Sequence, residues 1–336
     1  MKALRKLAPA PGLFLCDIPA PPAPGPGEVL VRVDAAGICG SDLHIEDWSG
    51  GYEFITGAMP VTLGHELAGG IAESADPALP VGTPVVVIPS VTCGVCPACR
   101  AGEEDRCLDR RGIGMTREGG FARHVLAPAR NCLVLPEGFD PGIAALTEPM
   151  VIGARAVSVG GVSPGDRVLV LGPGAIGQTV ALMAREAGAA EVTITGRDDA
   201  ARFAVLRRLG FDRLVEAGQV SDRFDVVFEA VGIPELVAES LPLLRREGVL
   251  VICGIHPRPA AIPLNTLVRE QLQLRGTNRG KRSDWQRAFD FVLREGAALA
   301  PMVTHRLKLR DGLAGFDLAR RRVATKVVLM PEDADA

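Results

Sequence analysis

The chain has 336 residues, enough for about two domains of ordinary size with a core that needs no disulfides. Hydrophobic residues make up 47% of it, which is typical of a globular protein, and the net charge is only −3 without a basic stripe. This balance argues against nucleic acid or an anionic membrane as a partner.

The first half of the chain is rich in Pro and Gly and has short apolar runs. Residues 28–33 and 85–88 predict short strands of an irregular β domain. The N-terminal apolar run is too short and interrupted for a secretory signal. No stretch approaches the roughly 20 apolar residues that span a bilayer, so we expect a cytoplasmic protein.

Two short segments of the first half carry metal-ligand side chains. They are Cys39-Gly-Ser-Asp-Leu-His44 and Gly64-His65-Glu66, and a further acid, Glu148, precedes Pro149. Alone, Cys39 or His65 would be an ordinary buried residue, His44 a surface histidine, and Glu148 an acid at the start of a helix. A thiolate, an imidazole and a carboxylate together could bind zinc and leave a fourth position for water or a substrate oxygen.

Four further cysteines are bunched in one loop. Their pattern is Cys93-x2-Cys96-x2-Cys99-x7-Cys107. Four soft ligands with no open position predict a closed, structural zinc site. Free thiols, redox-active Cys-x-x-Cys pairs and an iron–sulfur cluster are the alternatives for this loop.

From about Thr147 the chain changes to strands that alternate with helices. Such alternation predicts a parallel sheet joined by right-handed crossovers. The expected strands are 168–171, 191–195, 225–230, 249–253 and 272–276, and the expected helices are 176–187 and 236–244.

A Gly-x-Gly-x-x-Gly turn follows the first of these strands and opens a helix, which is the context of a dinucleotide-binding fingerprint. Gly172 permits the tight turn, Gly174 lets a pyrophosphate approach the backbone, and Gly177 lets the helix pack on the strand. We expect Ile176 to belong to the same coenzyme site.

A last helix is predicted after Gly280, because Trp285, Ala288, Phe289 and Val292 recur at i, i+3, i+4 and i+7. The tail 325–330 predicts a strand that rejoins the N-terminal domain.

In their order along nearly the whole chain, these motifs resemble the zinc-dependent medium-chain dehydrogenases. The resemblance is greatest to the sorbitol (polyol) and threonine dehydrogenase branch, through residues 39–48 and 301–305. It implies an α/β protein with two domains. A β-rich GroES-like catalytic domain would cover residues 1–150 and be completed by 283–336, and a doubly wound Rossmann domain would cover 151–282.

The resemblance also implies roles for individual residues. Cys39, His65 and Glu148 would bind a catalytic zinc, and Glu66 would lie beside them and bind the ion when substrate is absent. Ser41 would take the proton of the zinc-bound alcohol and pass it through the coenzyme ribose to His44. A hydroxyl donates and accepts at once, and an imidazole exchanges protons near neutrality, so the chemistry fits these roles.

Two departures from the family pattern narrow the range of expected substrates. Glu148 stands where classical alcohol dehydrogenases have a cysteine, which favours the polyol-like branch. The threonine enzymes carry a histidine just before the cysteine loop, whereas residues 88–93 have none, which argues against L-threonine.

The coenzyme preference depends on the end of the second strand of the sheet. An acid there would bind the ribose 2′-hydroxyl of NAD. By resemblance Gly196 occupies that place, and Arg197, joined by Arg202, could bind the 2′-phosphate of NADP. Asp198 or Asp199 in the role of the acid is the alternative, which would give NAD.

The predicted function is therefore reversible hydride transfer between a secondary alcohol or polyol, or its ketone, and NADP, with two zinc ions per chain. Family resemblance implies a homodimer or homotetramer. The alternatives are a zinc-independent quinone or enoyl reductase of the same fold and a non-enzymatic, nucleotide-binding redox sensor.

Overall fold

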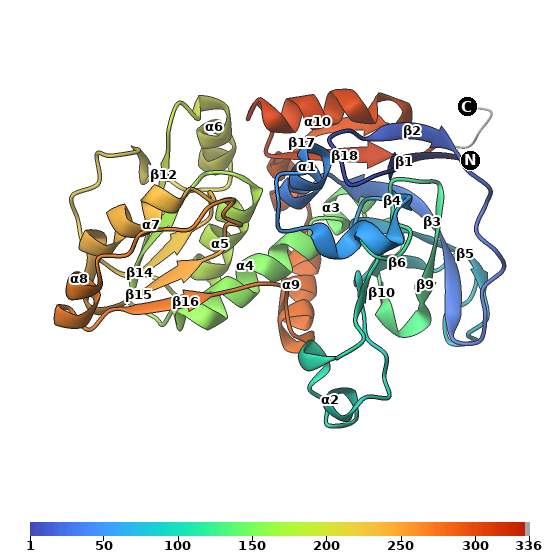
Figure 1. The fold of residues 1–336 in the computed structure, drawn as a ribbon, viewed down its shortest axis with the longest axis horizontal. Helices are drawn as coiled ribbons and strands as arrows, with labels where there is room; N and C mark the ends of the chain where they lie inside the picture. The colour runs from blue at the N-terminus through green and yellow to red at the C-terminus, as the bar shows by residue number, and fades with distance from the viewer. Residues whose placement is uncertain (333–336) are drawn as a thin grey trace. The chain divides into compact units, whose positions relative to one another are not determined.

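The computed structural model describes residues 1–332, and the chain divides into two compact units. Unit 1 comprises Met1–Glu148 and Glu295–Ala336, and unit 2 comprises Pro149–Arg294. Figure 1 shows the elements of both units.

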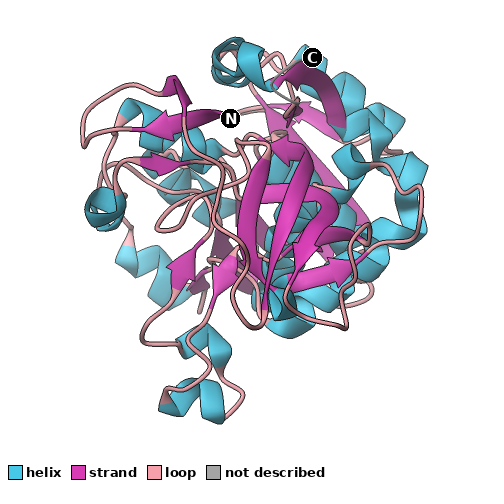
Figure 2. Ribbon diagram, turned by 90° about the vertical axis from the view of Figure 1, so that its right-hand side faces the viewer, coloured by secondary structure: helices cyan, strands magenta, loops and turns pink. Residues whose placement is uncertain are grey.

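Unit 1 is built on a seven-stranded sheet in the order β10-β6-β5-β3-β18-β17, with β9 also paired to β3. Its long central strands are β3 (Glu28–Gly37) and β5 (Glu66–Ser74), which pair antiparallel. The other strands are β6 (Pro84–Val87), β9 (His124–Pro128), β10 (Cys132–Val134), β17 (Val303–Lys308) and β18 (Lys326–Met330). The β-rich first domain is confirmed, and the sheet strands are magenta in Figure 2.

The C-terminal tail completes this sheet, as the sequence predicts. Strand β18 pairs antiparallel with β3, with Val328 opposite Gly37. Three short strands, β1 (Lys2–Lys6), β2 (Phe14–Asp17) and β4 (Val61–Thr62), form a second sheet, and β7 (Ser90–Val91) pairs with β8 (Arg111–Gly112) in a third. The unit also contains the helices α1 (Gly40–Asp47), α3 (Pro141–Ala144) and α10 (Gly312–Arg320). The segment that carries α2 (Pro97–Arg100) extends away from the sheets (Figures 1 and 2).

Unit 2 contains a six-stranded, all-parallel sheet in the order β13-β12-β11-β14-β15-β16. In chain order this is 3-2-1-4-5-6, the doubly wound Rossmann arrangement. The strands are β11 (Arg167–Leu171), β12 (Glu191–Gly196), β13 (Leu214–Glu216), β14 (Phe224–Glu229), β15 (Leu244–Ile252) and β16 (Gln273–Gly276).

The helices of unit 2 are α4 (Thr147–Gly160, which begins in unit 1), α5 (Ala175–Glu186), α6 (Ala200–Arg208), α7 (Pro234–Ser240), α8 (Leu264–Arg269) and α9 (Arg282–Glu295). The apolar face predicted for α9 is confirmed, because Trp285, Ala288 and Val292 are buried.

Helix α9 belongs to unit 2, although the expected boundary at 282 placed it with the catalytic domain. Its contacts explain the difference. Asp284 lies 3.9 Å from Arg155, and Arg294 forms a 2.9 Å ion pair with Glu186. The return to unit 1 therefore begins at Glu295.

One stretch, Pro141–Gly160, is long and apolar enough by length and composition to cross a membrane, which the sequence analysis did not expect. However, 72% of its most apolar window is buried inside the fold. Burial of this kind is typical of a core helix, which is apolar all round because protein surrounds it.

Candidate metal centres and coenzyme turn

The first candidate centre forms where β3 meets β5. Cys39 caps the N-terminus of α1 two residues after β3 ends, and His65 directly precedes β5. The register pairs Gly37 with Glu66, which brings these distant segments together. One ligand atom each of Cys39, His65 and Glu66 lies within 4.8 Å of the others.

A glycine turn sets the direction of His65. Gly64 has a φ of +92°, and a Cβ there would lie 2.6 Å from the Phe121 ring. Only glycine adopts this backbone at low cost while the ring packs so closely. The turn directs the imidazole into the protein interior, and His65 is only 5% exposed.

Asp42, which the sequence analysis did not assign to the site, lies behind the imidazole. Its Oδ1 is 3.6 Å from His65 Nδ1, and its Oδ2 accepts the Cys39 N–H at 2.9 Å. Burial raises the pKa of Asp42 to about 6, against the charge of His65. A carboxylate at Nδ1 orients a metal-binding histidine and leaves Nε2 for the ion.

Burial disfavours the charged form of His65, but the charges of Asp42 and Cys39 outweigh it and raise its pKa. A proton and a metal ion would compete for the Nε2 of this ring, so metal binding at His65 depends on pH.

Ser41 and His44 lie on α1 and are both partly buried. Ser41 Oγ is 3.4 Å from His65 Nε2, the nitrogen that would face the ion. His44 Nδ1 is 2.9 Å from Ser49 Oγ, and its ring stacks on Tyr52 at 6.2 Å between centroids. The hydroxyl is thus beside the candidate centre, and their proton relay stays a prediction.

Glu148, at the start of α4, lies outside the group of three ligand atoms. It is nevertheless close enough for electrostatic interaction. Burial raises its pKa to about 7, which the charge of His65 opposes. Its role as the third zinc ligand stays a prediction, and in this structure Glu66 completes the group.

Lys326 is a second residue of the centre that no sequence motif indicates. Its Nζ donates to Glu66 Oε1 at 2.7 Å, and both side chains are buried. No spacing rule connects residues so far apart in the chain, so the sequence held no signal for this pair.

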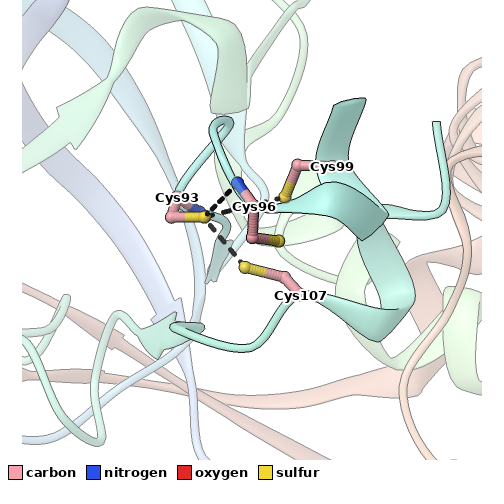
Figure 3. Close-up of side chains that lie close together, drawn as sticks. All are labelled: Cys93, Cys96, Cys99 and Cys107. Atoms are coloured by element: carbon pink, nitrogen blue, oxygen red, sulfur yellow. Dashed lines mark hydrogen bonds between the residues drawn. The ribbon is translucent and has the colours of Figure 1, made fainter. Parts of the chain in front are cut away.

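The second candidate centre is the four-cysteine loop (Figure 3). The sulfur atoms of Cys93, Cys96, Cys99 and Cys107 all lie within 4.8 Å of one another, and none forms a disulfide. Zn–S bonds of about 2.3 Å in a tetrahedron would place sulfur atoms about 3.8 Å apart. The Cys93 and Cys99 sulfurs are 3.9 Å apart, so the loop fits zinc.

Backbone N–H groups already favour thiolates in this loop. The backbone N–H of Cys96 donates to the Cys93 sulfur, and the backbone N–H of Cys93 donates to the Cys107 sulfur, each at 3.3 Å. N–H groups of Cys99 and Leu108 lower the pKa of Cys96. Burial and a hydrogen bond with the neighbouring Cys96 side chain raise the pKa of Cys99 instead. A cation bound among the four sulfur atoms would favour the thiolate form of each of them.

The glycine turn of unit 2 connects β11 to α5. Gly172 has a φ of +106°, and a Cβ at Gly177 would collide with the Gly172 carbonyl oxygen. A Cβ at Gly174 would meet no atom within 4 Å. The backbone at Gly174 therefore faces open space at a helix N-terminus, where a phosphate can approach.

The end of β12 carries the residues expected to choose the coenzyme. A Cβ at Gly196 would lie 2.8 Å from Pro173 and 3.0 Å from Asp199. Asp199 is buried, accepts the Arg197 N–H at 3.2 Å and lies 3.4 Å from Arg202 Nη1. The Asp199 carboxylate is thus held by its own loop, while Arg197 is exposed.

Comparison with known proteins agrees with the two-domain fold described above. Residues 25–137 match the alcohol dehydrogenase GroES-like domain, and residues 175–294 match the zinc-binding dehydrogenase domain. An L-threonine 3-dehydrogenase from Saccharopolyspora erythraea is 33% identical, with 98% of each chain covered.

Solved structures resemble the chain over nearly its full length. A zinc-binding dehydrogenase from Sinorhizobium meliloti, bound to NADP, is 30% identical with a TM-score of 0.84, and the match covers 98% of this chain and 99% of the other. An alcohol dehydrogenase from Escherichia coli, complexed with NADH, is 25% identical with a TM-score of 0.86 over the same shares.

Proposed function

The chain belongs to the zinc-dependent medium-chain dehydrogenase family and is an oxidoreductase that acts on CH–OH groups, and from this premise we propose that it transfers hydride between a secondary alcohol or polyol and NADP. The observation that carries the proposal is the convergence of Cys39, His65 and Glu66 within 4.8 Å. Asp42 behind the imidazole gives it the support expected at a metal site.

Two zinc ions per chain fit the donor sets. Cys39, His65 and Glu148, with Glu66 beside them, would hold the catalytic ion, and the four-cysteine loop would hold the structural one. When bound, zinc supplies a Lewis acid and the coenzyme a hydride acceptor.

The proton of the alcohol leaves through the side chains of α1. Ser41 Oγ, adjacent to His65 Nε2, accepts this proton and passes its own hydroxyl proton onward, because a hydroxyl can donate and accept a hydrogen bond at once. His44, hydrogen-bonded to the exposed Ser49, is the exchange point with solvent.

The preference for NADP rests on Arg197. Arg197 is exposed at the end of β12, and Gly196 itself carries no carboxylate, although the Asp199 carboxylate lies beside it. Asp199, the alternative ligand for a ribose hydroxyl, is buried and engaged by its own loop. Arg202 would assist from α6.

We further propose a cytoplasmic homo-oligomer that assembles through unit 2. Strand β16 pairs only with β15 among the described residues, which leaves one backbone edge available. The nearby exposed apolar side chains include Leu264 and Val268, four residues apart on α8, and Leu274 on β16. Light scattering would measure the molar mass of the protein in solution and so the number of copies in the assembly.

The test is a panel of secondary alcohols, polyols and ketones, followed by nicotinamide absorbance with each coenzyme. We expect turnover with NADPH or NADP on part of the panel, and loss of turnover after chelation of the catalytic zinc. Turnover that survives complete removal of that zinc would instead indicate a zinc-independent reductase. Zinc-loaded protein that binds NADPH but turns over nothing would indicate a non-enzymatic role.

A further inference from the structure

A buried ion pair joins the C-terminal strand to the candidate catalytic centre. Lys326 is 2% exposed and Glu66 is fully buried. Lys326 Nζ lies 2.7 Å from both carboxylate oxygens of Glu66 and also donates to the Ile38 carbonyl at 3.0 Å. The lysine is therefore fixed by the backbone of the loop that leads to Cys39, as well as by the carboxylate.

Gly37 makes the space for this pair. A Cβ at Gly37 would collide with Glu66 Oε2. Gly37 does not have a positive φ, so the turn geometry does not require a glycine here. Its missing side chain instead accommodates the carboxylate in the position where it meets Lys326.

The same carboxylate also belongs to the candidate metal group. An oxygen of Glu66 lies within 4.8 Å of the ligand atoms of Cys39 and His65. A buried carboxylate without a partner is strongly destabilised, so Glu66 must pair with a cation. Two cations compete for it: the ammonium of Lys326 and the ion of the proposed catalytic centre.

We propose that Lys326 is a positioning residue that holds Glu66 off the catalytic ion and thereby keeps one ligand position open for the substrate. The inference rests on the proposed function, because it requires an ion at Cys39 and His65. Without Lys326, the carboxylate finds its remaining partner in the ion. Glu66 would then bind the ion as an additional protein ligand, which would slow the release of the ion and block the position that substrate needs.

The test compares the release of catalytic zinc to a chromogenic chelator in wild type, Lys326→Met, Glu66→Gln and the double variant. The catalytic zinc is the fraction that a Cys39→Ala variant lacks. We expect Lys326→Met to slow release by about tenfold or more, which corresponds to about 1.4 kcal/mol of added metal binding, and to lower kcat more than it changes KM. Lys308→Met, on the adjacent strand β17, is the matched control and should behave as wild type.

The double variant separates positioning from general structural support. Glu66→Gln removes the charge that competes for the ion, so adding it to Lys326→Met should return the release rate to within about threefold of Glu66→Gln alone. A cobalt-substituted sample gives a second readout, because a change of coordination number changes its visible absorption. Lys326→Met should alter that spectrum, and the double variant should restore it.

If Lys326→Met fails to fold, Gly37→Ala tests the same point, because its methyl group displaces the carboxylate from Lys326. It should slow zinc release as Lys326→Met would. Wild-type release rates and spectra in Lys326→Met or Gly37→Ala would overturn the inference. A wild-type protein that binds no zinc at Cys39 would instead overturn the proposed function.

Discussion

Replacing Asp42 with Asn probes the carboxylate behind His65. The side chain keeps its size, and its oxygen can still accept the Cys39 N–H that Asp42 binds at 2.9 Å. The new NH2 group then faces His65 Nδ1, which is 3.6 Å from Asp42 Oδ1 in the structure. With an ion on Nε2, Nδ1 carries a hydrogen, so two donors oppose each other.

The size of the effect follows from the burial of Asp42. Loss of a partner behind a metal-binding histidine weakens metal binding by about 10–100-fold, or about 1.4–2.7 kcal/mol. Asp42 is fully buried, and water cannot separate the opposed donors. We therefore expect the upper end of this range for the catalytic zinc and no change for zinc in the four-cysteine loop.

The assay is zinc competition with a chelator of known affinity. Asp47→Asn is the control, since Asp47 lies on the same helix but is exposed. Catalytic zinc bound within about threefold of wild type by Asp42→Asn, or equal losses in both variants, would refute the reasoning.

Three further substitutions test the other parts of the account. Cys99→Ser removes a ligand of the structural zinc, so we expect a Tm lower by about 5 °C or more by calorimetry; an unchanged Tm and zinc content would argue against a metal there. Gly177→Ala forces a methyl group onto the Gly172 carbonyl, and NADPH fluorescence titration should show about a tenfold or greater loss of affinity; an unchanged Kd would contradict the close packing. Arg197→Ala should weaken the binding of NADPH by about tenfold or more and that of NADH by less than about twofold, whereas equal losses of affinity would remove the argument for NADP.

The Rossmann sheet was readable from the sequence because its strands are short apolar runs bounded by glycine. Strands β11, β12, β14 and β16 lie within one or two residues of their expected bounds, whereas β15 begins at Leu244, five residues before the expected 249. Helix α6 and strand β13 were missed for physical reasons. Helix α6 buries only Phe203, Val205 and Leu206 and ends in two exposed arginines, and β13 has only three residues. Neither carries enough periodic apolar sequence to signal its type.

The candidate site was readable where its members are metal-ligand types in short motifs, as with Cys39, His65 and the four-cysteine loop. Asp42 and Lys326 gave no such signal. Asp42 has the ordinary appearance of an acid in the first turn of a helix, and Lys326 meets Glu66 only because β18 pairs with β3. Tertiary pairing across 260 positions is not encoded in any local spacing.

The central claim is that a zinc ion is held by a thiolate and an imidazole brought together by β3 and β5. Anomalous diffraction at the zinc edge from crystals of the zinc-loaded protein tests it most directly. The account predicts two peaks per chain, one among the four cysteines and one bonded to Cys39 and His65. A single peak at the cysteine loop, from protein that still oxidises alcohols, would contradict it.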